Sequence, residues 1–383
     1  MLQRSKQLTR FCLFEGHYLL SLDVTGYFSS HDVHCDHCCV KTHKDGKKTY
    51  YHQMLGGVLV HPDEPTVLPF APEPMLKQDG TKKNECERNA SKRMLSRIRK
   101  DHPQLKLIVV ADGLASNAPH IRHLQSLHMR FILGVKPGDH AALFDWVKHH
   151  DEVSCLSAQE GSGKKLITRE YRWLHQVPLN DSHPDLLVNY LECKETKAGK
   201  TTTFTWITDL PITKENVATI TKGARARWKI ENETFNTLKN QGYQFEHNFG
   251  HGKQHLSTVF ANLMFLSFMI DQIQHMACKR FQAALAVFVN TKRRLWQKIS
   301  GIFELCIIPS WQALFDVIIH KKTTPYPTTI THQEIYCFGS QTLILRKKYS
   351  NKSIRLSGRN QNVRLKIYEK HQKNFTGAAG LYS

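Results

Sequence analysis

The run KLIVVADG at residues 106–113 decides the fold class of this 383-residue chain. It is a continuous stretch of aliphatic and β-branched residues that ends at Asp112 and Gly113. A strand that is apolar on both faces is typical of the middle of a sheet that is covered on both sides. The Asp-Gly pair marks the point at which the chain leaves that strand.

The segments around this strand predict the rest of a layered domain. A stripe of apolar residues at helical spacing precedes it, and period-two or continuous apolar runs indicate further strands. The predicted order is strand, strand, strand, helix, strand, helix, strand, at residues 18–28, 50–60, 66–71, 84–100, 106–113, 117–128 and 130–136. This order predicts an α/β domain.

The pattern changes twice further along the chain. Between 141 and 205 the helical spacing is lost, and alternating strands with Gly-rich turns predict an inserted β-rich subdomain. Helical spacing returns from Asn216 to about residue 320. Residues 341–383 then hold ten Lys or Arg and a single acid, Glu369. We expect this basic tail to be the least core-like part.

The charge balance points to a polyanionic partner. Lys and Arg total 53 against 33 Asp and Glu, a formal net charge of +20 with a pI near 9.5. Such a surplus attracts nucleic acid at long range. The start of the chain does not resemble a signal peptide, and the apolar run 256–270 is shorter than the roughly 20 residues of a membrane span. We therefore expect a buried helix there, reduced thiols at the ten cysteines and a cytoplasmic protein.

Two aspartates lie where a sheet would expose them to a common edge. Asp23 stands inside an apolar run, and Asp112 ends the buried strand. A carboxylate in an apolar run is costly unless it is paired or binds a cation. The alternative is structural: Asp112 would cap the next helix, and Asp23 would open an Asx-turn before Thr25 and Gly26.

A third acid lies in the segment GARARWKIENETFNTLKNQGY at 223–243. In helical register, Arg227 and Glu231 share one face and Lys239 continues near it, while Trp228 and Ile230 are expected to anchor the helix. The alternative is a solvated helix with ion pairs between residues four apart.

These three segments together resemble the DDE transposases of bacterial insertion sequences, in the IS-four-like branch. The signature helix of that branch reads Tyr-x2-Arg-x3-Glu-x6-Lys. Arg227 and Glu231 match it, whereas Ala224 stands at the Tyr position and Lys239 lies one residue late. The segments around Asp23 and Asp112 and the run at 240–256 also resemble the corresponding blocks. The likeness extends over roughly residues 11–320. Because members of the branch carry a helical region before the first Asp and only 22 residues precede Asp23 here, we expect this chain to be a truncated member.

The resemblance implies a fold and a chemistry. The fold would be an RNase H-like mixed sheet flanked by helices and interrupted by the β-rich insertion. The catalytic residues would be Asp23, Asp112 and Glu231, which would together bind two Mg²⁺ or Mn²⁺ ions. The expected partners are double-stranded DNA, both transposon ends and target, and a second copy of the chain. The expected location is the bacterial cytoplasm. Expected DNA contacts come from Arg227, Lys239, His251 and Lys253.

The predicted domain boundaries follow from these patterns. Residues 1–10 are expected to be a stub of an upstream region, and 11–140 the first part of the catalytic core. The β-rich insertion at 141–205 separates it from the second part of the core at 206–275. C-terminal helices at 276–320 and the basic tail at 321–383 follow.

Several alternatives stay open at this point. Cys35 and Cys38, with His43 and His52 following, could form a zinc knuckle, although a loop of free thiols explains them too. The segment 248–255 is either a DNA contact or a plain loop. Further acids that could replace one of the three are Asp79, Glu85 and Glu87. Two other functions fit the same features: a basic DNA-binding protein without catalysis, and a metal-dependent nuclease without strand transfer.

Overall fold

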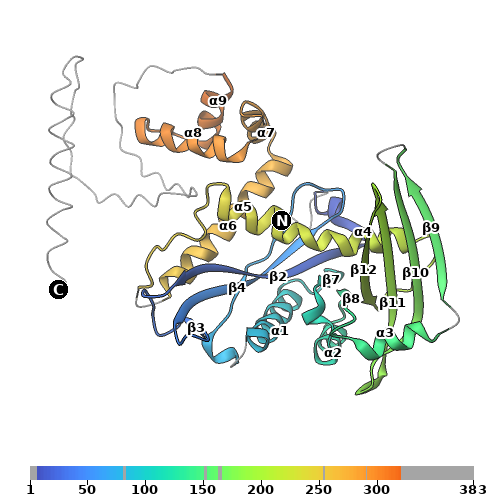
Figure 1. Cartoon of the computed structure of the whole chain (residues 1–383). Helices are drawn as coiled ribbons and strands as arrows, with labels where there is room; N and C mark the ends of the chain where they lie inside the picture. Colours follow the sequence, from blue (N-terminus) through green and yellow to red (C-terminus); the bar gives the residue numbers. More distant parts are fainter. Residues whose placement is uncertain are drawn as a thin grey trace, which may run out of the picture.

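The protein is described by a computed structural model over residues 7–80, 83–150, 153–162, 166–252, 255–289 and 291–320. In this part a 12-stranded mixed sheet runs through the molecule with helices on both faces (Figure 1). The path of the sheet is β3-β4-β2-β7-β8-β12-β11-β10-β9, with β1, β5 and β6 paired at its side. The basic tail at 321–383 and residues 1–6 of the expected stub lie outside the described residues.

The centre of the sheet is formed by β2 (His17–Ser30), β4 (Lys48–Val60), β7 (Leu107–Ala111) and β8 (Arg130–Gly134). β2 is antiparallel to β4 but parallel to β7, and β7 is parallel to β8. All five residues of β7 are buried, as its continuous apolar sequence predicts. The parallel pairs bring the carboxyl ends of β2 and β7 to the same edge.

Both faces of this centre are covered. Along β2 the side chains alternate between two clusters, with Leu20 in one and Leu19 in the other. The first cluster contains the buried stripe of α1 (Lys83–Asp101) and α2 (Ala118–Ser126). The second contains α4 (Val217–Arg225) and α6 (Leu256–Ala277). The α/β layering expected from the sequence is therefore observed.

The β-rich segment continues the main sheet. Its strands are β9 (Ser154–Glu160), β10 (Ile167–Asn180), β11 (His183–Lys197) and β12 (Lys200–Thr208), each antiparallel to the next. β12 pairs with β8, with Trp206 opposite Gly134, so no break separates these strands from the centre. The expectation that helices are absent between 141 and 205 is wrong at its start, because α3 (Ala141–Lys148) buries Leu143 and Val147 against the sheet.

The remaining elements are short or lie at the end of the described chain. The helices α7 (Lys279–Ala286), α8 (Lys292–Leu305) and α9 (Trp311–His320) pack together around Phe281 in a cluster of their own. The small elements are η2 (Leu8–Phe11), β1 (Cys12–Phe14), β3 (Cys39–Thr42), β5 (Leu68–Pro69), β6 (Glu73–Pro74), η3 (Lys77–Asp79) and η4 (Gly113–Ala115).

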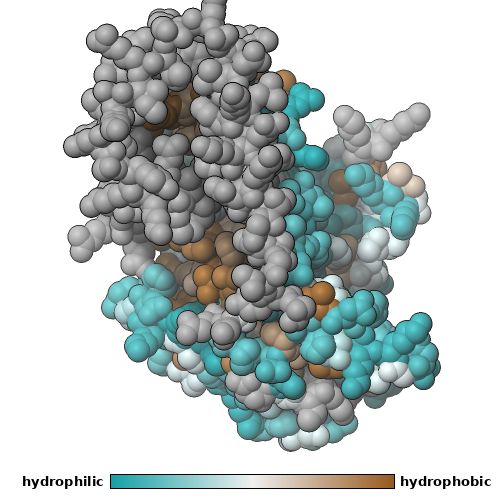
Figure 2. Space-filling view, turned by 90° about the vertical axis from the view of Figure 1, so that its left-hand side faces the viewer, coloured by the Kyte–Doolittle hydropathy of each residue, from teal (hydrophilic) through white to brown (hydrophobic). Residues whose placement is uncertain are grey.

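The apolar helix α6 packs on the sheet with one side only. Its 22 residues meet the length and composition of a membrane span, with a mean hydropathy of 1.4 over the best window. Ala261, Phe265 and Phe268 are buried in the second cluster, as expected for a helix of the fold. On the opposite side Val259 and Leu266 are exposed, and Figure 2 shows hydrophobic residues gathered on the face that α6 borders.

Candidate active site

Asp23 and Asp112 meet at the common edge of β2 and β7. In the parallel pairing Ser21 is opposite Val110, so two residues further on Asp23 comes beside Asp112. Both side chains line one cavity, together with Glu87 and His120; we call this the acid cavity. Asp23 lies in the interior of β2, which excludes the Asx-turn alternative. Asp112 does cap the following turn, accepting a 3.0 Å hydrogen bond from the Leu114 amide, and it lines the cavity as well.

Glu231 lies on a helical stretch that changes its winding. After α4 come a 3-10 turn η6 (Ala226–Trp228), a π-helix η7 (Ile230–Phe235) and α5 (Asn236–Asn240). A π turn takes up one more residue than an α turn. The π segment begins one residue before Glu231 and ends at Phe235, so it takes up the one residue by which Lys239 lies later than the expected pattern.

Arg227 joins the helix to the strand. Its guanidinium is 3.5 Å from Asp23 Oδ2 through Nη1 and 3.0 Å from Glu231 Oε1 through Nη2. The Arg227 carbonyl also accepts a 3.0 Å hydrogen bond from the hydroxyl of Ser21 on β2. Asp23 and Glu231 are far apart in sequence, and the structure brings both carboxyl groups to the guanidinium group of Arg227.

The environment of Asp23 favours a neutralised carboxyl. The pKa of Asp23 is raised to about 6: burial is the largest cause and the nearby Glu231 adds to the rise, while the Val24 amide and Arg227 oppose it. Two carboxyl groups this close repel each other unless a proton or cation is shared. Their oxygens are the donors that Mg²⁺ prefers, so the residues present fit a hard divalent cation.

The other residues expected to contact DNA have different surroundings. Lys239 forms a 2.8 Å ion pair with Glu246, and His251 lies beside two cysteines, as described below. Lys253 lies outside the described residues. The expected anchoring by Trp228 is wrong: its side chain is 53% exposed, and Arg227 lies over its ring, whereas Ile230 is fully buried. The contacts of these residues with DNA stay predictions.

The further acids differ in their roles. Asp79 is buried and forms an ion pair with Arg93, which also binds Glu73, so it holds α1 against the adjoining loop. Glu87, one of the acids that the sequence offered as a replacement, lines the acid cavity. The side chain of Glu85 lies outside the described part of the chain.

Of the two histidines expected near the cysteine pair, His52 lies beside it and His43 does not, while His251 joins from a distant part of the chain. Cys35 and Cys38 lie with His52 of β4 and His251 of the loop before α6, all four ligand atoms within 4.8 Å of one another. The expected third ligand, His43, is turned to Thr49, whose hydroxyl is 2.7 Å from its Nε2. His43 follows the cysteines closely in sequence, but the strand pairing of β3 with β4 carries it away from them.

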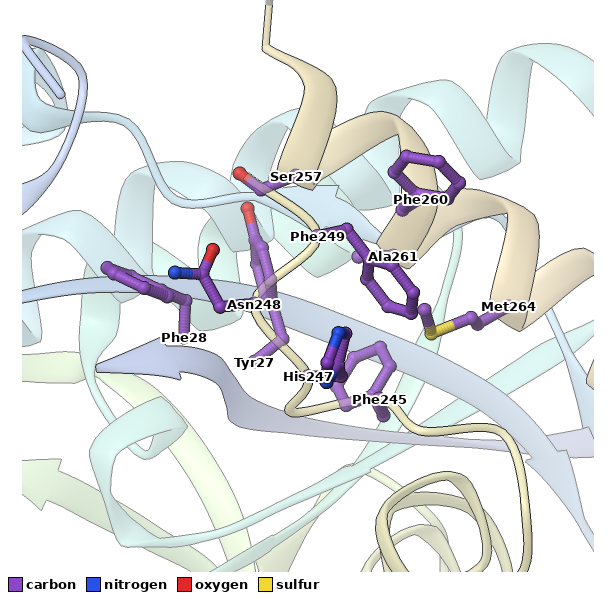
Figure 3. Close-up of a pocket in the computed structure, with 10 residues that line it drawn as sticks. All are labelled: Tyr27, Phe28, Phe245, His247, Asn248, Phe249, Ser257, Phe260, Ala261 and Met264. Carbon is purple, nitrogen blue, oxygen red and sulfur yellow. The ribbon is translucent and has the colours of Figure 1, made fainter. Parts of the chain in front are cut away.

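An apolar pocket lies between the end of β2, the loop at 245–249 and α6 (Figure 3). Phe249 stacks on Phe260 of α6 with 4.9 Å between the ring centroids. The hydroxyl groups of Tyr27 and Thr258 form a hydrogen bond of 2.9 Å. The pocket is lined by aromatic rings and small polar groups and includes no carboxylate. The stacking of Phe249 on Phe260 holds the loop against α6, and among the described residues the pocket shares no lining residue with the acid cavity.

A comparison with protein families decides the relationship. A family model described as a transposase DDE domain matches residues 30–269, more than half of the chain. The chain belongs to this family. The matched DDE domain includes Asp112 and Glu231 and begins seven residues after Asp23. No curated protein matches the chain.

A search of solved structures found similarity to a transposase. The matched chain comes from the cryo-EM structure of the piggyBac transposase synaptic complex with hairpin DNA, at 9% sequence identity and a TM-score of 0.38. The alignment covers 85% of this DDE transposase chain and 66% of that chain.

Proposed function

We propose that this chain cleaves transposon ends in a metal-dependent reaction and joins them to target DNA, on an RNase H-like core. Membership of the transposase DDE family supports DNA transposition in general and the use of divalent metal ions. The observation that carries the finer proposal is the meeting of three acids. Asp23 and Asp112 share a cavity, and Arg227 joins Asp23 to Glu231.

The proposed reaction assigns a separate task to each group. Asp23, Asp112 and Glu231 would hold two Mg²⁺ or Mn²⁺ ions, which polarise a phosphodiester and activate the attacking water or 3′-hydroxyl when bound. Asp23 is fixed by the strand and by the Val24 amide at 2.8 Å. Arg227 orients Glu231 toward Asp23, and it balances their negative charge before metal and DNA bind.

The partners follow from the same proposal. The net charge of +20 suits double-stranded DNA, because each Lys or Arg at a phosphate releases a counterion. Joining both ends of an element requires two ends to be held together, so we also propose that the chain acts as a homodimer on DNA, in the bacterial cytoplasm.

The test uses a labelled duplex that carries the ends flanking the coding gene, a supercoiled target plasmid and Mg²⁺. Asp23→Asn, Asp112→Asn and Glu231→Gln should each abolish cleavage and joining while leaving DNA affinity nearly unchanged, because affinity comes from many phosphate contacts. Glu233→Gln is the matched control, since Glu233 lies on the same π segment with an exposed side chain.

Each contrary result has a distinct meaning. Loss of binding together with cleavage would assign the acids a structural role. Cleavage by the native chain without joining would identify a nuclease. Binding without any cleavage would identify a DNA-binding protein that has lost catalysis.

A further inference from the structure

Four metal-ligating side chains converge from separate parts of the chain. Cys35 and Cys38 come from the loop between β2 and β3, His52 from β4, and His251 from the loop between α5 and α6. Their Sγ and ring nitrogen atoms all lie within 4.8 Å of one another. Cys38 and His52 are buried, and the other two are partly buried.

The distances among Cys35, Cys38 and His52 match those of a tetrahedral zinc site. Zn–S bonds of about 2.3 Å and Zn–N bonds of about 2.0–2.1 Å place tetrahedral ligand atoms roughly 3.8 Å apart for two sulfurs and roughly 3.6 Å apart for sulfur and nitrogen. The Sγ atoms of Cys35 and Cys38 are 3.7 Å apart. The Nε2 atom of His52 lies 3.5 Å from Cys35 Sγ and 3.3 Å from Cys38 Sγ.

Hydrogen bonds do not explain why the ring of His251, the fourth member of the group, is buried there. Both ring nitrogens of His251 are buried, and neither has a hydrogen-bond partner among the described residues. A polar atom that is buried without a hydrogen-bond partner destabilises the folded state. The ring is held from one side by Phe28, edge to face at 4.4 Å, and its centroid is 5.3 Å from that of His52.

Backbone hydrogen bonds hold the loop of Cys35 and Cys38 in a turn that points both thiols to the same side. The Cys38 amide donates to the Cys35 carbonyl at 3.1 Å, which closes the Cys-x2-Cys turn. The Cys35 amide donates to Cys38 Sγ at 3.4 Å. Amide donors of this kind stabilise a thiolate and orient it as a ligand.

We propose that Cys35, Cys38, His52 and His251 bind one structural Zn²⁺ ion. Two thiolates and two imidazoles form a closed tetrahedral set of the kind that selects zinc over the hard cations that carboxylates prefer. The acid cavity and this site therefore take different metals. The assignment replaces His43 and does not depend on the proposed DNA chemistry.

The site connects the loop that follows the Glu231 helix with the strands of the sheet against which that helix packs. His251 belongs to the loop that leaves the Glu231 helix, and its partners belong to the hairpin of β2, β3 and β4. On its other side the same loop packs into the aromatic pocket of Figure 3 through Phe249. Zinc at the Cys/His group would fix the loop from the second side and so hold the end of the helix against the sheet.

The experiment measures metal in the full chain, purified under reducing conditions without chelator and loaded with Zn²⁺ or Co²⁺ alone. One zinc per chain should resist dialysis, and Co²⁺ should give the intense visible absorption of a tetrahedral site with thiolate charge-transfer bands. Cys38→Ser and His251→Asn should each lose the bound zinc. His43→Asn and Cys155→Ser are the controls and should keep it, since His43 bonds Thr49 and Cys155 is exposed on β9.

A second measurement uses the native sequence and does not depend on the folding of a variant. Removing zinc with a strong chelator should lower the melting temperature, and adding Zn²⁺ back should restore it. The proposal is overturned if the native chain binds no stoichiometric zinc, if Co²⁺ gives no thiolate bands, or if Cys35 and Cys38 form a disulfide. It is also overturned if His43→Asn loses the metal while His251→Asn keeps it.

Discussion

The ring of Phe235 lies so close to Gly56 that a Cβ atom added to the glycine would be 2.8 Å from Phe235 Cε1. Gly56 is the register partner of Asp23 across the β2–β4 pairing, and Phe235 ends the π segment that carries Glu231. Because Gly56 has no side chain, the helix that carries Glu231 can approach the strand of Asp23 this closely.

Gly56→Ala should destabilise the protein by roughly 1–3 kcal/mol, because a methyl group forces the Phe235 ring or the helix away from the sheet. The denaturant midpoint measures this change. Gly138→Ala is the control, since a Cβ at Gly138 meets nothing within 4 Å, and its effect should stay within about 0.5 kcal/mol. Equal shifts for the two variants would contradict the close packing.

Mg²⁺ should raise the melting temperature of the native chain in the absence of DNA, because an ion that binds only the folded state stabilises it by mass action. Asp23→Asn should remove this response. Without Mg²⁺ the same variant should melt no lower than the native chain, since burial already disfavours the Asp23 carboxylate. A full Mg²⁺ response in Asp23→Asn would place the ion elsewhere.

Asp271 of α6 should make stability depend on pH. Burial raises its pKa to about 7, while the hydrogen bond from Tyr243 and the charge of Lys292 oppose the rise. The native state then holds a proton that the unfolded chain loses near pH 4. This group's contribution to stability falls as the pH rises from about 4 to 7, and is constant above that.

Asp271→Asn removes this titration and keeps a side chain of the same shape. The difference in melting temperature between Asp271→Asn and the native chain should therefore grow in favour of the variant as the pH rises from about 4 to 7. Melting curves across this range measure it. A difference that is independent of pH would show that Asp271 is ionised throughout in the folded state.

Deleting residues 341–383 should weaken DNA binding equally for every sequence and reduce the slope of log affinity against log salt, because ten basic side chains are lost. Binding titrations at several salt concentrations measure the slope. Cleavage at saturating protein should survive, since Asp23, Asp112 and Glu231 lie elsewhere. Insoluble protein after the deletion would contradict the view of this segment as a solvated polycation.

Local patterns were enough to predict the central elements. The continuous apolar run at 106–113 and the helical stripe at 84–100 gave β7 and α1 within two residues of their observed ends. The acids could be found because a carboxylate next to a buried strand is costly, and parallel pairing then explains why Asp23 and Asp112 share an edge.

Contacts between distant segments could not be predicted in the same way. Trp228 was expected to anchor the helix because it is large and apolar, yet the switch from 3-10 to π winding turns it outward and Ile230 inward. His43 and His52 were both considered as zinc ligands because they follow the cysteines in sequence, whereas His251 lies far beyond them in the chain and was not. Only the fold shows which histidines reach them.

The long chain separation within the acid site bears on the order of events during synthesis. Arg227 and Asp23 pair across 204 residues, and every strand of the β-rich segment is made between them. Contacts this distant in sequence form late, after local helices and hairpins. A nascent chain therefore carries Asp23 and Asp112 without their third acid until the Glu231 helix has left the ribosome. Assembly of the complete acid site is thus delayed until most of the domain has been translated.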